Sequence, residues 1–120
     1  MSKEKNSMSK LERALQIWTV LIGKAYNRQI LTYGELAEII GFRGAGVLGT
    51  YLDFIMRYCD NKKYPPLTCI VVNKKEGKPG EGLITIDREN FALKREEVFN
   101  YKWYQLPPMR IENFNNLDKH

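Results

Sequence analysis

The stretch that decides the fold begins QILTYGELAEIIGFRGAGVLGTYL (residues 29–52) and ends PPLTCIVVN (residues 65–73). Thr32 and Glu35 form the T-x-x-E pattern of a capping box, in which each side chain satisfies an amide at the start of a helix. Apolar residues at helical spacing follow, and Gly41 supplies the left-handed residue that ends a helix at low cost. A second periodic apolar run comes after the glycine-rich turn. Two helices joined by such a turn predict a helix-turn-helix.

The segment before this stretch predicts another helix. Ser9 and Glu12 form a second capping-box pattern, and apolar residues then recur at three- and four-residue steps. We therefore expect a helix from about residue 10 to 26. Trp18 lies within the apolar stripe, so we interpret it as a core residue.

The segment after the two helices predicts a small sheet and a final helix. Residues 59–66 are polar and end in two prolines, which indicates an exposed loop. Residues 67–73 are apolar and β-branched, which predicts a buried strand, and residues 83–86 resemble a short partner strand. Together they would form a two-stranded antiparallel wing. A last helix is expected from about residue 89 to 104.

Length and composition bound the fold class. The chain has 120 residues and 43% hydrophobic residues, which suits one folded domain. We expect an α+β, winged-helix-like domain with a helix-turn-helix and a short wing. It would comprise residues 10–106, between a flexible tail at residues 1–9 and a C-terminal extension at residues 107–120, in which apolar residues spaced by three allow a last docking turn.

Several classes of protein are disfavoured by the sequence. There is no apolar run long enough for a membrane span and no signal-like hydrophobic segment, so we expect a cytoplasmic protein. Two cysteines and one histidine give no metal-ligand spacing, and we expect neither a metal nor a cofactor. The net charge of +5, with several basic residues near the helix-turn-helix, favours contact with phosphates.

Four segments in a fixed order suggest a family. They are T-Y-G at residues 32–34, V-L-G-x-x-L at 47–52, P-x-x-x-x-V-V-N at 66–73 and G-x-x-G-x-G at 77–82. Their order and spacing resemble the DNA-binding domain of O6-alkylguanine-DNA alkyltransferases. The stand-alone alkyltransferase-like proteins are the nearer match, because nothing here corresponds to the separate N-terminal domain of many alkyltransferases. The resemblance covers roughly residues 10–85.

The resemblance implies a function in DNA binding. In this family the helix-turn-helix enters the minor groove of double-stranded DNA, and the tyrosine at the position of Tyr33 pushes on a phosphate while a damaged nucleotide rotates out. The residues expected to contact DNA are Thr32, Tyr33, Gly34, Arg43, Gly44, Gly46, Thr50 and Arg57. The residues expected around a flipped base are Tyr33, Thr68, Cys69, Asn73, Lys78 and Gly80.

The sequence departs from the family where an arginine enters the base stack. That arginine stands three residues before a glycine that corresponds to Gly49, so Gly46 occupies its position. Arg43 lies one helical turn earlier and is the candidate replacement.

The sequence also departs from the family's Cys-His-Arg motif. Alignment on the last V-x-N places Thr68 at the cysteine, Cys69 at the histidine and Ile70 at the arginine. A slip of one residue would make Cys69 the nucleophile, but in a strand this slip turns the side chain to the opposite face. Neither register supplies an adjacent base to form a thiolate. We therefore expect no catalytic residue, with Cys69 as a weak candidate.

Three hypotheses follow from the sequence. The first is a non-catalytic DNA-binding protein that senses alkylated or flipped bases. The second is a winged-helix protein-interaction or regulatory module that has lost base flipping and has a protein partner. The third, which the sequence favours least, is a suicide alkyltransferase that uses Cys69.

Overall fold

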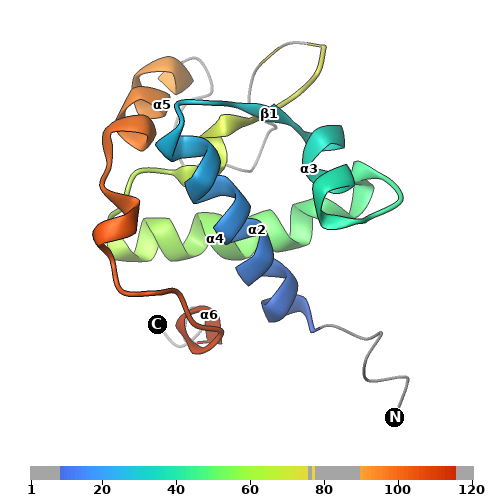
Figure 1. Ribbon diagram of the computed structural model, residues 1–120, viewed down its shortest axis with the longest axis horizontal. Helices are drawn as coiled ribbons and strands as arrows, with labels where there is room; N and C mark the ends of the chain where they lie inside the picture. Colours follow the sequence, from blue (N-terminus) through green and yellow to red (C-terminus); the bar gives the residue numbers. More distant parts are fainter. Residues whose placement is uncertain (1–8, 76, 78–89, 116–120) are drawn as a thin grey trace.

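The long N-terminal helix α2 (Lys10–Tyr26) forms one side of the hydrophobic core. The computed structural model of the protein describes residues 9–75, 77 and 90–115. The capping box is present as predicted: the Glu12 amide donates to Ser9 Oγ (3.1 Å), and the Ser9 amide donates to Glu12 Oε1 (2.9 Å). The buried face of α2 packs across helix α4 (Leu48–Lys62), as Figure 1 shows.

The predicted pair of helices is confirmed. The first helix is α3 (Tyr33–Ile40), and Gly41 ends it in the left-handed conformation with a φ of 92°. A short 3₁₀ helix, η1 (Ala45–Val47), then leads into α4. The pair is bent by 93° at the intervening turn. Ile39, one of the apolar residues at helical spacing in α3, is 51% exposed.

The polar loop predicted over residues 59–66 is wrong in its first half, because α4 continues to Lys62. Tyr58 and Cys59 are buried and extend the apolar face that Leu52 and Ile55 begin. The helix stops where Lys63 takes a left-handed conformation, with a φ of 62°, ahead of two prolines. Burial of this face thus outweighs the polar composition of the last turn.

The strand predicted over residues 67–73 is mostly a 3₁₀ helix, η2 (Leu67–Ile70), and only β2 (Val71–Val72) is a strand. All four residues of η2 are buried and contact α2, α4 and helix α5 (Phe91–Asn100). A 3₁₀ turn fits this position because it points successive side chains in three directions, whereas a strand offers only two faces.

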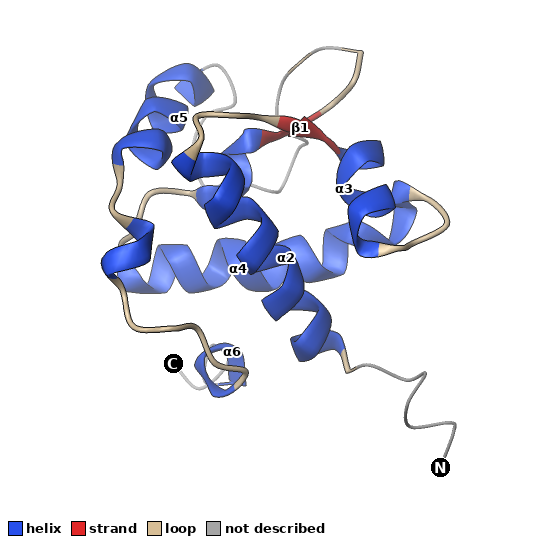
Figure 2. Ribbon diagram, in the orientation of Figure 1, coloured by secondary structure: helices blue, strands red, loops and turns tan. Residues whose placement is uncertain are grey.

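The described sheet is parallel, whereas the predicted wing is antiparallel. Strand β2 pairs with β1 (Leu31–Thr32), with Leu31 opposite Val71 and Thr32 opposite Val72 (Figure 2). The predicted partner strand, residues 83–86, lies outside the described residues. The fold is thus α+β, mostly helical, with a short two-stranded parallel sheet.

The final helix is shorter than predicted, because α5 ends at Asn100 and a separate 3₁₀ helix, η4 (Trp103–Gln105), follows. The side chain of Trp103 explains the break. Its buried Nε1 donates to the carbonyl of Val98 (2.8 Å), so the chain turns back at Tyr101 to place the indole ring in the core.

Contacts between aromatic rings connect the C-terminal segment to the core. Trp18 is buried as predicted and meets Tyr58 and Trp103 edge to face, with ring centroids 5.7 and 5.6 Å apart. The short helix α6 (Glu112–Asn115) brings Phe114 onto Tyr58, also edge to face at 5.7 Å. The C-terminal segment therefore docks on the domain.

The described ranges contain neither a single membrane-spanning helix nor a metal-binding cluster. No single helix there is long and apolar enough to cross a membrane, although the bent pair Tyr33–Ile40 with Ala45–Lys62 has the length and composition to do so. The same residues hold no cluster of His, Cys, Asp and Glu side chains able to bind a metal ion.

Replacing Phe114 by Ala should lower the free energy of unfolding by about 3–5 kcal/mol, because it leaves a cavity against Tyr58. Urea denaturation would measure the change. Leu93 is 70% exposed, so Leu93→Ala is a matched control expected to stay within about 0.5 kcal/mol of the parent. Equal stability of the Phe114→Ala variant and the parent would show that α6 does not support the core.

Candidate nucleic-acid interface

The parallel pairing of β1 and β2 places two of the predicted site residues side by side. Tyr33 follows β1 and Asn73 follows β2, at the same edge of the sheet. Thr32 starts α3 through the predicted capping box, since its amide donates to Glu35 Oε1 (2.8 Å) and its Oγ1 accepts from the Glu35 amide (3.1 Å). Tyr33 is therefore fixed, half-buried, at the first position of α3, and Gly34 beside it is exposed.

Asn73 shapes the turn that leaves β2. Its Oδ1 accepts from the amide of Lys75 (2.8 Å), and its carbonyl accepts from the amide of Gly77 (2.7 Å). Gly77 has a φ of 68°, a conformation that suits glycine. A structural role therefore accounts for Asn73. Lys78 and Gly80, which were predicted to line the same pocket, lie outside the described residues.

The turn between α3 and α4 exposes a run of small residues and one cation. Gly44, Gly46 and Gly49 are exposed, and a Cβ added at any of them would meet no atom within 4 Å. None of the three has a positive φ. Arg43 is exposed beside them, and Val47 projects from η1 with 55% of its surface exposed. Sequence reasoning did not predict this exposure of Val47.

The first turns of α4 carry the other predicted contacts. Thr50 is exposed, and Arg57 lies two turns further on the same side of the helix. Arg57 is half-buried, and its Nε pairs with Asp53 Oδ2 at 3.0 Å. The carboxylate of Asp53 thus offsets the charge of Arg57, so Arg43 is the stronger of the two for attracting a phosphate.

Thr68 and Cys69 are not at the surface. Both lie in η2 with no exposed area, and Cys69 Sγ donates to the carbonyl of Phe91 (3.3 Å). Burial raises the pKa of the Cys69 thiol to about 11, although the nearby charge of Arg95 acts to lower it. At neutral pH only about one thiol in ten thousand would be ionised. This environment is that of a core cysteine and does not activate a nucleophile.

Arg95 was not identified from the sequence. It lies on α5, and its guanidinium carbon is 4.7 Å from the ring centroid of Phe91. Its Nε and Nη2 atoms are buried and have no hydrogen-bond partner among the described residues. The sequence around Arg95 has no motif that distinguishes it from any other charged residue on a helix.

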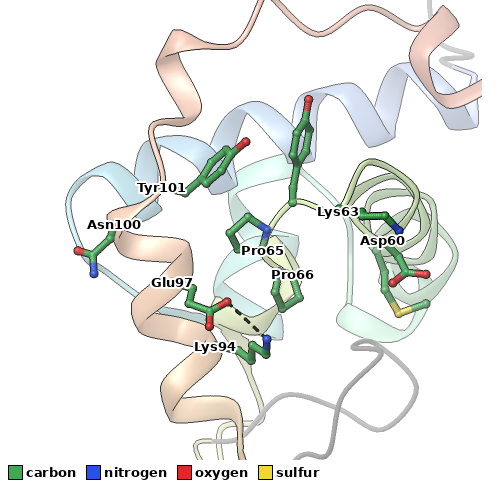
Figure 3. Close-up of a pocket in the computed structure, with 10 residues that line it drawn as sticks. Asp60, Lys63, Pro65, Pro66, Lys94, Glu97, Asn100 and Tyr101 are labelled. Carbon is green, nitrogen blue, oxygen red and sulfur yellow. Dashed lines mark hydrogen bonds and ion pairs between the residues drawn. The ribbon is translucent and has the colours of Figure 1, made fainter.

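The largest of the described pockets, about 670 Å³, has none of the predicted site residues in its lining. It is a cleft between the end of α4 and α5, and Pro65 and Pro66 form part of its lining (Figure 3). Lys94 and Glu97 on the α5 wall form an ion pair of 3.5 Å. Among the described residues, this lining contains neither histidine nor cysteine, and its charges are mixed.

The structure therefore divides the predicted residues into two groups. Arg43, Gly44, Gly46 and Thr50 are all exposed, in the turn between α3 and α4 or in the first turn of α4, and Tyr33 lies at the start of the preceding helix. It buries Thr68 and Cys69 in the core.

Comparison with known proteins adds no identification. No protein-family model matches the chain, and no curated protein or solved structure matches it significantly.

Native protein should resist alkylation by iodoacetamide at pH 8, because burial raises the pKa of the Cys69 thiol to about 11 and that of Cys59 to about 12. Intact-mass spectrometry should show two adducts after unfolding in guanidinium chloride and almost none before it. A rapid single adduct on native protein, absent from a Cys69→Ser variant, would show instead that Cys69 is an accessible nucleophile.

Proposed function

We propose that this chain is a non-catalytic module that binds double-stranded DNA through the turn between α3 and α4. The proposal joins the resemblance described above to one structural observation: the exposed glycines of the turn have no internal explanation. The helix-turn-helix geometry supports it as well, since the bend of 93° between the helices lies in the range of such motifs.

Glycine is usually required by a positive φ or by lack of space for a side chain. Gly41 has the first reason, with its φ of 92°, but Gly44, Gly46 and Gly49 have neither. A glycine also lets another molecule approach the backbone closely. Gly44 and Gly46 lie in the same short segment as Arg43, and Gly49 lies in the first turn of α4, so a phosphate backbone is a partner that fits both features.

The start of the helical segment provides suitable donors. No side-chain hydrogen bond caps η1 at Gly44 or α4 at Val47. Backbone amides at a helix start carry a partial positive charge and bind phosphates readily. The exposed glycines leave room for a phosphate to reach them, and Arg43 adds a full charge at the same place.

Tyr33 extends the proposed interface. It stands at the start of α3, where the resemblance implies a tyrosine that presses on a DNA phosphate. We therefore place the DNA minor groove against α4, and we propose that the protein senses alkylated or flipped bases there.

A second candidate is a module that binds DNA or protein without base flipping. One observation favours it: Thr68 and Cys69, which would line a base pocket, have no exposed area. Equal affinity for intact and alkylated duplexes would favour this candidate over a lesion sensor.

Replacing Gly46 or Gly49 by Ala should weaken duplex binding by about tenfold, because each added methyl group holds a phosphate backbone away. Neither change should reduce stability, since each methyl group would point into open space. Gly23→Ala, in α2, is the matched control and should leave affinity unchanged. Fluorescence anisotropy with a labelled duplex and urea denaturation would provide the two measurements.

The glycine prediction has a clear contrary result. Tight, unaltered binding by the Gly46→Ala and Gly49→Ala proteins would mean that DNA does not approach this turn. Loss of binding accompanied by loss of stability would mean that the glycines serve the fold.

Removing the charge of Arg43 should reduce the salt dependence of binding. Each phosphate contact contributes about −0.9 to the slope of log K against log salt concentration, so Arg43→Ala should make the slope shallower by about one. Arg110→Ala removes the same charge from the C-terminal segment and is the control. Identical slopes for the parent and the Arg43→Ala protein would exclude a phosphate contact by Arg43.

A further inference from the structure

Two neighbouring pockets lie beside α2 and η4, and neither the fold nor the proposed DNA interface accounts for them. Their volumes are about 430 and 310 Å³, and Trp103 and Tyr104 line both. We call the two pockets together the α2–η4 groove. One end is aromatic and basic, and the other end is apolar, with Ile22, Pro107 and Met109 in its lining.

Two aromatic side chains with a large exposed fraction border this groove. Tyr26 is 71% exposed and Tyr104 is 60% exposed, and their rings meet edge to face with centroids 5.5 Å apart. Neither ring is needed to fill the core. Exposed tyrosines beside a tryptophan are typical of residues that dominate the energy of protein interfaces.

The floor of the groove is packed into the core through Trp103. Trp103 is buried between Trp18 and Tyr101, with ring centroids at 5.6 and 4.6 Å, and its Nε1 is held by the carbonyl of Val98. A preformed surface loses little conformational entropy on binding, so more of the contact energy appears as affinity.

At the basic end of the groove, Arg28, which follows α2, pairs with residues of α5. Arg28 donates two hydrogen bonds to Glu96 (2.8 and 3.0 Å) and one to Asn100 Oδ1 (3.2 Å). Its guanidinium carbon also lies 5.0 Å from the ring centroid of Phe99. These contacts fix the wall of the groove and leave Arg28 with little charge to offer a ligand.

The charge that remains for a partner belongs to Lys102. It is exposed, and no other described residue pairs with it. The described lining of the groove contains Arg28 and Lys102 but no aspartate or glutamate. An occupant with a carboxylate at this end and an apolar side chain at the other therefore complements the groove.

A peptide fits this arrangement better than a nucleic acid. A nucleic acid strand carries one negative charge at every nucleotide. The apolar half of the groove has no charged side chain in its lining, so phosphates there would lose water and find no cation. A peptide can place charged and apolar side chains independently.

We infer that the α2–η4 groove binds a linear segment of a partner protein that combines a large apolar or aromatic anchor with acidic residues. Figure 1 shows η4 and α3 on opposite sides of α2, so this groove and the proposed DNA interface lie apart. The inference does not depend on DNA binding.

The test uses the full chain and a displayed library of random linear peptides, with the Tyr104→Ala protein for counter-selection. We expect enrichment of peptides that carry an aromatic or large apolar residue beside Asp or Glu. A labelled consensus peptide should bind Tyr104→Ala about tenfold more weakly than the parent and should also lose affinity for Lys102→Glu. Leu93→Ala removes an exposed side chain outside the groove and should bind normally.

Circular dichroism would confirm that each variant folds. If Tyr104→Ala does not fold, Lys102→Glu still tests the groove. The inference is overturned if no apolar and acidic consensus is enriched. It is also overturned if the consensus peptide binds the folded Tyr104 and Lys102 variants as tightly as the parent. Binding of labelled oligothymidylate that is lost in Tyr104→Ala would overturn it in favour of nucleobase stacking.

Discussion

The complete burial of four consecutive residues, Leu67–Ile70, is the constraint on which the structure depends. Four neighbouring side chains that all avoid water need partners in several directions, and η2 finds them in α2, α4 and α5. The strand β2 begins directly after this turn, so its pairing with β1 is set by the same packing. Through β1 the constraint reaches Tyr33 and the helix pair that presents the glycine turn.

The same burial lowers the reactivity of the two cysteine thiols. Cys69 is part of the buried turn, with its thiol directed at the carbonyl of Phe91, and Cys59 lies on the buried face of α4. A thiol in such a place is a small apolar group with a raised pKa. The interpretation of the chain as a binding module therefore rests on packing as well as on the missing histidine and arginine.

Local signals in the sequence predicted local structure well. The capping boxes at Ser9 and Thr32 and the left-handed Gly41 each depend on residues within a few positions, and all three are confirmed. The failures needed distant partners. Residues 67–70 are apolar and β-branched enough for a strand, but three surrounding helices favour a 3₁₀ turn, and the position of Trp103 ends α5 early.

The candidate site shows the same division between local and distant information. The sequence predicted Arg43, Gly44 and Gly46 as DNA contacts, and the structure shows all three exposed in one short segment. It could not predict the burial of Thr68, nor the groove that joins Tyr26 to residues 103–109, because no local pattern brings these segments together. The two surfaces that we propose as interfaces differ in their residues, one with exposed glycines and Arg43 and the other with tyrosines, apolar side chains and Lys102.

The most direct test of the account is a titration of isotope-labelled protein with duplex DNA at low salt, followed by amide chemical shifts. The account predicts that the largest changes fall on residues 43–50 and on Tyr33 and Gly34, with residues 103–109 unaffected. Changes concentrated on η4 and α5, or no change at any DNA concentration at low salt, would contradict the claim that the glycine turn is a nucleic-acid interface.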